Sequence, residues 1–235
     1  DIKVHGDIEI IRQVPGRIDF NLRSAKRNLR LHITRINQRN YIRNIKVIPQ
    51  KYVGIYTRQT FNPEYLKTSR NFNSIRFMPW QNTKLTKLKE WHQRATPQSA
   101  FYNHNAGMPV ETMIDMANQS QADPWFSMPF KAGDDYIKKF GEYVNENLKP
   151  SLKAYIEYSN EVWNPIFIHH DYAIQQGMKL KLDKQKSQAG YKWFSKRSVE
   201  TFKSWEEVFG GTDRLIRVMG GWVSNQILSN TLLSY

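Results

Sequence analysis

The chain has 235 residues, a formal net charge of +14 at pH 7 and no cysteine, so it has neither a disulfide framework nor a zinc–thiolate site. Hydrophobic residues make up 40% and charged residues 24% of the chain, which is a globular composition and excludes wholesale disorder. No apolar run reaches the roughly 18 residues that a membrane-spanning helix needs.

The positive charge is concentrated near the N-terminus. Residues 1–58 hold 13 basic and 4 acidic side chains, whereas residues 59–235 hold 22 and 17. A nucleic-acid interface would need this charge on one face with aromatic rings between the basic groups. The arginines are instead spread through strand-like sequence, where they could face solvent, an anionic glycan or another chain: Arg12, Arg17, Arg23, Arg27, Arg30, Arg35, Arg39 and Arg43. Nucleic acid is therefore not the favoured partner.

The first part of the chain is predicted to form short β-strands. Residues 8–11, 17–22 and 28–33 alternate in part between apolar and polar, and Pro15-Gly16 predicts a turn between the first two. Residues 41–48 alternate again and stop at Pro49. The pattern predicts the C-terminal part of a β-sandwich accessory domain over residues 1–50, with its beginning upstream.

From residue 51 onward, helical and strand patterns alternate. Pro63 suits a first helical turn, and Ile137, Phe140, Val144 and Leu148 recur at helical spacing. We expect helices over 62–71, from Pro109, from Asp134, over 166–180, over 190–209 and over 224–234, and strands over 74–78, 125–128, 154–158 and 215–219. This order predicts parallel strands with helical crossovers, in a doubly wound sheet or a (β/α)8 barrel. No Gly-x-Gly-x-x-Gly follows a strand, which disfavours a nucleotide-binding sheet.

The segment 155–164 carries the most chemical information. A predicted strand ends in Asn160-Glu161 and is followed by Trp163. Glycoside hydrolysis needs a carboxylic acid beside the glycosidic oxygen, an adjacent amide can bind a sugar hydroxyl, and an indole can stack on a sugar ring. The alternative is that Asn160-Glu161 is an ordinary loop dipeptide.

This segment resembles the fourth-strand acid/base motif of clan A glycoside hydrolases, which are retaining (β/α)8-barrel enzymes. Further stretches that share the resemblance occur in the same order, at residues 72–78, 109–118, 122–129, 205–210 and 214–219. Together they are similar to large secreted proteins described as cellulose-binding or hydrolase-like, with a β-sandwich ahead of the barrel. The resemblance covers nearly the whole chain, most clearly residues 41–228. It implies an α/β fold, namely a partial (β/α)8 TIM barrel of about strands 1–5 over residues 51–235, and a secreted or cell-surface location.

The resemblance also implies roles for individual residues. Glu161 would be the general acid/base, Asn160 would hold the sugar 2-hydroxyl, and Arg76 would match the arginine that orients the nucleophile. Four residues would contact the substrate: Trp80, Tyr158, Trp163 and Asn164. The alternatives are a strand-end ion pair for Arg76 and core packing for the tryptophans, and core packing is the favoured expectation for Trp125.

The sequence departs from the family pattern at two positions. Pro79 stands where an acidic residue is expected, and Phe130 stands where a polar residue such as histidine is expected. Clan A barrels also carry a second glutamate after the seventh strand, and about five barrel-like strands precede Tyr235. The glutamates of the late helical stretch, Glu200, Glu206 and Glu207, are not suitable substitutes. We therefore expect the nucleophile beyond Tyr235, in a larger protein.

Two functions remain open from the sequence. The first is a glycoside hydrolase acting on a β-linked polysaccharide, with no cofactor and no metal, since the histidines lack metal-ligand spacing. The second is a non-catalytic carbohydrate-binding, structural or filament-forming extracellular protein on a hydrolase scaffold. Pro79, Phe130 and the uneven charge favour the second reading.

Overall fold

A computed structural model of the chain describes residues 2–24, 29–43, 45–99, 102 and 105–235. Two features of the sequence analysis lie outside these residues, namely Arg27 and the first residue of the strand predicted over 28–33. The chain divides into two compact units, Asp1–Arg58 and Gln59–Tyr235. This division follows Arg58, whereas the sequence predicts a boundary after residue 50.

The first unit contains two small antiparallel sheets. Its elements are β1 (Ile2–His5), β2 (Ile8–Val14), β3 (Arg17–Leu22), β4 (Arg30–Ile33) and the short 3-10 helix η1 (Gln50–Tyr52). β1 pairs with β4, and β2 pairs with β3. Gly16 has φ +79, a left-handed conformation that glycine adopts easily in the tight turn between β2 and β3. The predicted β-sandwich stays a prediction.

The strand predicted over residues 41–48 is wrong for the residues that the structure describes. The nearest pairing is a single bridge between Asn37 and Asn40. The apolar side chains of Tyr41, Ile45 and Val47 are 55%, 49% and 64% exposed. Alternation alone does not make a strand, because the backbone N–H and C=O groups also need a neighbouring strand.

The second unit is an α/β fold around a parallel sheet. Its strands are β5 (Ser74–Arg76), β6 (Asp123–Met128), β7 (Ala154–Tyr158) and β8 (Leu215–Val218). They form one parallel sheet in the order β5-β6-β7-β8. This confirms the predicted mixed α/β class and the parallel strands with helical crossovers. The described residues contain no closed barrel.

Six helices of the second unit precede, connect or follow these strands in the described chain. They are α1 (Pro63–Ser69), α2 (Val110–Ser120), α3 (Asp134–Asn147), α4 (Ile168–Lys179), α5 (Lys186–Phe209) and α6 (Gln226–Ser234), and the short 3-10 helix η2 (Trp91–Gln93) precedes α2. Asn62 caps α1, because its side-chain oxygen accepts a hydrogen bond from the Glu64 backbone N–H at 2.9 Å. None of the described helices is long and apolar enough to cross a membrane.

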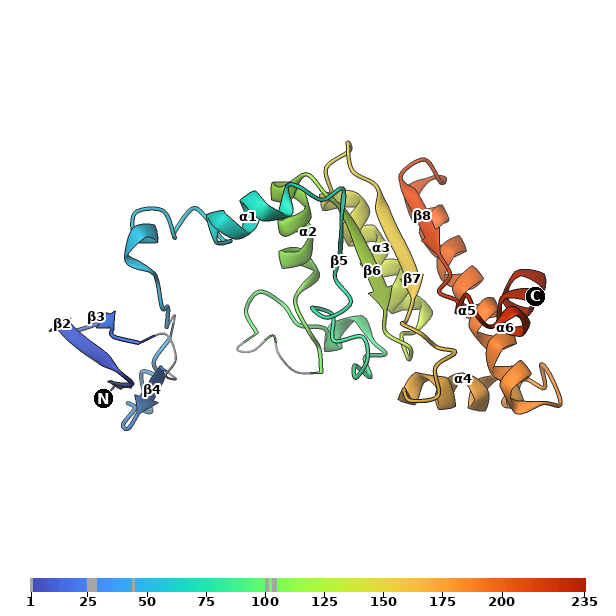
Figure 1. Cartoon of the computed structure of the whole chain (residues 1–235), viewed down its shortest axis with the longest axis horizontal. Helices are drawn as coiled ribbons and strands as arrows, with labels where there is room; N and C mark the ends of the chain where they lie inside the picture. Colours follow the sequence, from blue (N-terminus) through green and yellow to red (C-terminus); the bar gives the residue numbers. More distant parts are fainter. Residues whose placement is uncertain (1, 25–28, 44, 100–101, 103–104) are drawn as a thin grey trace. The chain divides into compact units, whose positions relative to one another are not determined.

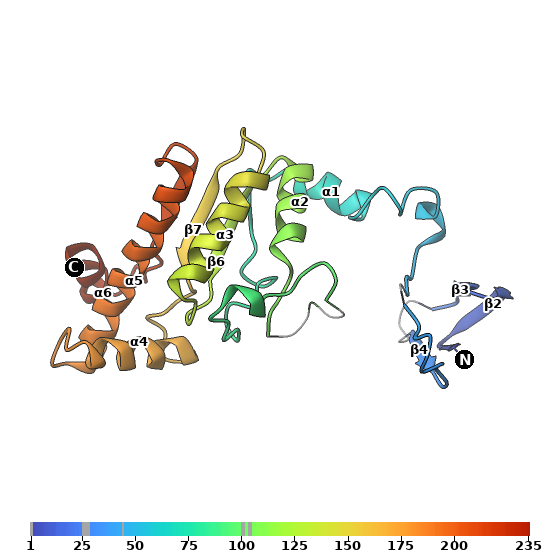
Figure 2. The ribbon, with the colours of Figure 1, turned by 180° about the vertical axis from the view of Figure 1, so that it is seen from behind.

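The helices α2, α3 and α5 cover one face of the sheet (Figure 2). Phe126 of β6 and Ile156 of β7 are fully buried on this face. The Phe126 ring lies 5.2 Å from the ring of Phe140 in α3 and 6.3 Å from that of Trp205 in α5. The hydrophobic core of the unit therefore lies between the sheet and these helices.

The opposite face of the sheet carries no helix of the described chain (Figure 1). Trp125, Tyr155 and Ile216 occupy the same level of β6, β7 and β8, and all three are half-buried. Ser127 and Glu157 follow one level further along their strands. Because the strands are parallel, their carboxyl ends and the loops that follow them meet at one edge of the sheet.

Candidate functional site

A buried carboxylate, Glu157 of β7, organises the open face of the sheet. Glu157 is 3% exposed. Its Oε2 accepts hydrogen bonds from Arg76 Nη2 at 2.7 Å, Trp125 Nε1 at 2.9 Å and Ser127 Oγ at 3.0 Å. These donors come from β5 and β6, so one carboxylate oxygen joins three neighbouring strands. A buried charge requires such partners, since an unpaired one would be strongly destabilising.

Arg76 links this carboxylate to the predicted motif. Its Nη2 also donates to Asn160 Oδ1 at 3.1 Å, and its guanidinium lies 4.8 Å above the Trp125 ring. The Arg76 side chain is 35% exposed. The structure thus brings together Arg76 and Asn160, which the resemblance implies as site residues, and gives Arg76 an acidic partner, Glu157. Sequence analysis missed Glu157, although a glutamate inside an otherwise apolar strand is a usable signal.

The turn after β7 carries two unfavourable features. Ser159 and Glu161 have φ values of 61 and 45, a left-handed conformation that costs about 1–3 kcal/mol for such residues. Ser159 and Asn160 are 0% and 1% exposed, yet Ser159 Oγ and Asn160 Nδ2 have no hydrogen-bond partner among the described residues. A buried donor without a partner costs about 1–3 kcal/mol. Such costs, concentrated in one turn, are typical of functional sites.

Glu161 is half-buried and lies in this turn. Its Oε2 accepts a hydrogen bond from Asn164 Nδ2 at 2.9 Å, and its backbone oxygen accepts one from the Asn164 N–H at 2.9 Å. Asn164, predicted to bind substrate, therefore contacts the predicted acid directly. The Glu161 side chain remains open in part to solvent.

Two tryptophans stack beside this edge of the sheet. The rings of Trp163, in the turn after β7, and Trp222, in the loop after β8, are 5.4 Å apart and inclined by 15°. Trp163 packs partly against the core, whereas Trp222 is 50% exposed. Sequence analysis missed Trp222, although a tryptophan directly after a predicted strand and Gly220-Gly221 is a visible signal. The pair presents a partly exposed aromatic surface formed by the loops after β7 and β8.

Three aromatic residues are placed differently from the expectation. Tyr158, predicted to contact substrate, is 1% exposed, donates its hydroxyl to the Phe130 backbone oxygen at 2.7 Å and belongs to the core, and burial raises its pKa. It points away from the open face because it follows Glu157 in the strand, and successive side chains alternate. Trp80 packs partly against the core beside Phe77, at 5.3 Å between rings. Trp125, expected in the core, is half-buried on the open face.

A buried histidine lies behind the turn. His169 of α4 is 0% exposed, and neither ring nitrogen has a hydrogen-bond partner among the described residues. Its ring stacks on Phe167 at 5.0 Å and lies 5.9 Å from Phe130. Burial lowers the pKa of His169 to about 4, while the Asn160 backbone and the Glu161 carboxylate act in the opposite direction. Phe130, at a position where the resemblance implies a polar residue, lies beside this imidazole.

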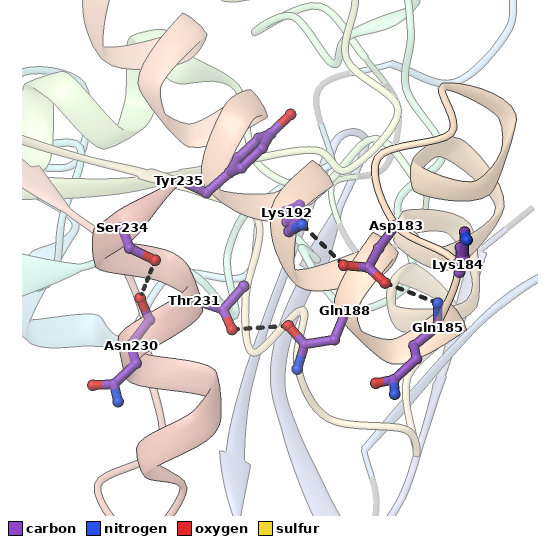
Figure 3. A pocket seen from close by; sticks show the side chains of 9 residues that line it. All are labelled: Asp183, Lys184, Gln185, Gln188, Lys192, Asn230, Thr231, Ser234 and Tyr235. Carbon is purple, nitrogen blue, oxygen red and sulfur yellow. Dashed lines mark hydrogen bonds and ion pairs between the residues drawn. The ribbon is translucent and has the colours of Figure 1, made fainter.

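A polar cavity of about 740 Å³ lies elsewhere, between the start of α5 and the end of α6 (Figure 3). The side chains of this cavity pair mainly with each other. Lys192 Nζ contacts Asp183 Oδ2 at 2.9 Å, and Thr231 Oγ1 donates to Gln188 Oε1 at 2.9 Å. None of its lining residues comes from the turn after β7, so the cavity is separate from the Glu161 site.

The described residues hold no group of three or more histidine, aspartate or glutamate side chains that could bind a metal ion. No family model, curated protein or solved structure matches the chain.

Proposed function

We propose that the protein acts on a β-linked polysaccharide at the carboxyl edge of the sheet, with Glu161 as the general acid/base of a retaining hydrolysis. One observation carries the proposal. Glu161 is a partly accessible carboxylate in a strained turn, oriented by Asn164 and followed by Trp163, which stacks on Trp222. The proposal includes an extracellular or cell-surface location.

Each group in the turn has a chemical task in this reaction. Glu161 protonates the leaving glycosidic oxygen and later removes a proton from the attacking water. The Trp163–Trp222 pair supplies an apolar surface for sugar rings, and the Asn160 amide donates to a sugar hydroxyl. In the proposal, β5–β8 are consecutive strands of a partial (β/α)8 barrel. Their parallel order, strand beside the next strand in sequence, supports this assignment.

Retaining hydrolysis also needs a nucleophilic carboxylate about 5–5.5 Å from the acid. Glu157 is poorly suited to that role, because it is buried and its Oε2 already accepts three hydrogen bonds. The retaining mechanism therefore needs a further carboxylate, in addition to Glu157 and Glu161.

Glu157 is occupied by three hydrogen bonds and is poorly suited to act as a nucleophile, which favours a second candidate function. In that alternative the protein binds a glycan without cleaving it, as a structural or filament-forming extracellular protein, and the Trp163–Trp222 pair is the binding surface. Exposed aromatic rings bind sugars without any catalytic carboxylate.

The experiment incubates the full-length protein with soluble mixed-linkage β-glucan, xylan and galactomannan, and measures released reducing ends and binding in affinity gels. We expect Glu161→Gln to lose hydrolysis by about 10²–10⁴-fold while it still binds. Glu146→Gln, at an exposed position of α3, is the matched control. A hydrolase that is equally fast with Glu161→Gln would refute the role of Glu161.

The same assays separate the two candidates. Binding without hydrolysis by the full-length protein, lost in Trp222→Ala, supports the glycan-binding alternative and refutes the proposed hydrolysis. A protein that neither binds nor cleaves any of the three polysaccharides overturns both.

A further inference from the structure

We infer that Glu157 is a positioning residue that acts through Arg76 to fix the orientation of the Asn160 amide. The arrangement engages the Oδ1 atom of Asn160 with Arg76 and leaves its Nδ2 as the atom that can donate to a ligand. The identity of that ligand rests on the proposed function, but the fixed orientation of the amide does not.

The orientation of the Asn160 amide follows from hydrogen-bond chemistry. A guanidinium has only donors, so the amide must turn its oxygen toward Arg76. Arg76 Nη2 lies 3.1 Å from Asn160 Oδ1. The amide nitrogen therefore points away from Arg76, where it is buried and has no partner among the described residues. A ligand reaches this nitrogen only after neighbouring side chains shift, since the atom has no exposed surface.

Arg76 is held in place by contacts on more than one side. Its guanidinium lies over the ring of Trp125, which stacks on Tyr155 at 5.5 Å. The Trp125 indole N–H donates to the same Glu157 oxygen that binds Arg76. Glu157 therefore holds both the guanidinium of Arg76 and the indole ring beneath it. Arg76, Trp125 and Glu157 restrain one another through these contacts.

The Glu157 carboxylate is itself tightly restrained. Its Oε2 accepts three hydrogen bonds, and its Oε1 lies where a β-carbon at Gly220 would approach to 3.2 Å. Glycine at position 220 therefore leaves room for the carboxylate beside the end of β8. One glycine and three hydrogen-bond donors thus surround the buried carboxylate of Glu157. Through Arg76, this carboxylate orders the Asn160 amide on the turn after β7.

Removal of the charge on Glu157 should release this order. Glu157→Gln keeps the shape of the side chain but weakens its bond to Arg76, because a charge-assisted hydrogen bond is about twice as strong as a neutral one. Arg76 then holds the Asn160 oxygen less firmly, and the amide can rotate to pair its nitrogen. A ligand hydroxyl that has reached this nitrogen would lose a donor of fixed orientation, with an expected loss of affinity on the order of tenfold.

The first test needs no ligand. The side-chain amide resonances of Asn160 are assigned in the full ¹⁵N-labelled chain by their loss in Asn160→Asp. We expect Glu157→Gln to shift or broaden both Nδ2 proton resonances. The matched control is Glu206→Gln, which changes another arginine–glutamate pair, between Glu206 of α5 and Arg217 of β8 at 2.7 Å, and should leave these resonances in place.

Unchanged Asn160 resonances in a folded Glu157→Gln variant would overturn the inference, whatever the glycan assays show. If that variant does not fold, Arg76→Lys takes its place, because the Arg76 side chain is 35% exposed and lysine keeps the charge. A lysine cannot reproduce the planar guanidinium. The same resonances should shift in Arg76→Lys, and their persistence would equally refute the positioning role.

The second test is a double-mutant cycle on glycan affinity, with the polysaccharide that binds best in the functional assay. Glu157→Gln should lower affinity about tenfold in the wild-type background and cause no further loss with Asn160→Ala. Equal losses in both backgrounds would show that Glu157 does not act through Asn160. If the wild type binds no glycan, the proposed function fails, and the resonance test alone decides the positioning role.

Discussion

The buried imidazole of His169 should make the stability of the second unit depend on pH. His169 is 0% exposed, both ring nitrogens lack a partner among the described residues, and aromatic rings surround it. Burial disfavours the charged form, so its pKa falls from 6.5 to about 4 in the folded protein. The unfolded state therefore binds a proton at higher pH than the folded state does.

The sign and size of the effect follow from this difference. Stability from neutral His169 is fully present above pH 6.5 and is lost as the pH falls through about 4. Each unit of pKa difference corresponds to about 1.4 kcal/mol, so acidification from pH 7 to pH 4 should lower the free energy of unfolding by about 3 kcal/mol. This is a large part of the 5–15 kcal/mol that typically stabilises a domain.

Urea unfolding followed by tryptophan fluorescence measures the effect. All 7 tryptophans lie in the second unit, so the signal reports that unit alone. Wild type and His169→Phe are compared at several pH values between 4 and 7, because phenylalanine fits an aromatic pocket and carries no proton. Carboxylate titrations affect both proteins equally, and their difference isolates His169. We expect wild type to lose about 3 kcal/mol more than the variant over this range.

The same substitution at His92, which is exposed, is the control and should leave the pH dependence as in wild type. Parallel stability curves for wild type and His169→Phe from pH 7 to pH 4 would refute the reasoning. They would mean that the imidazole is hydrated or hydrogen-bonded, and that the contacts behind the Glu161 turn differ from those described.

Two further substitutions test the packing of α4 against α5 and the strain in the turn after β7. Gly177→Ala places a methyl group against the backbone oxygen of Ala189, so we expect a loss of about 3 kcal/mol or more in the free energy of unfolding measured in urea. Gly221→Ala, with open space around it, should cause almost no loss. Ser159→Gly relieves φ 61 and removes an unpaired buried hydroxyl, so it should raise the unfolding free energy by about 1 kcal/mol. Ser159→Ala keeps the strained backbone and should gain less, and equal gains from both would contradict the strain argument.

The predicted elements of the second unit agree closely with the structure. The strand predicted over 154–158 is β7 with the same bounds, and Asp134 begins α3 as predicted. These elements are encoded locally, because the spacing of apolar residues and the residues at helix ends set the backbone conformation. The stretch 41–48 shows the limit of that reasoning, since its alternation resembles a strand that the described chain does not form.

The open face of the sheet could be foreseen only in part. The alternation of side chains places Glu157 and Tyr158 on opposite faces of the sheet, so the sequence already determined that the two side chains do not share one face. The sequence could not reveal which face the helices cover. That choice depends on how α2, α3 and α5 pack, and it decides that Glu157 lies on the open face and Tyr158 in the core.

The sequence by itself determined the order of strands and helices in the second unit and the placement of Asn160-Glu161 at a strand end, because both depend on residues close together in the chain. Only the tertiary structure placed Arg76 in contact with Glu157, 81 residues later in the chain, and stacked Trp163 on Trp222. Contacts of this kind depend on strand register and loop conformation, which arise from the packing of the whole unit. The candidate site exists only once three parallel strands stand side by side.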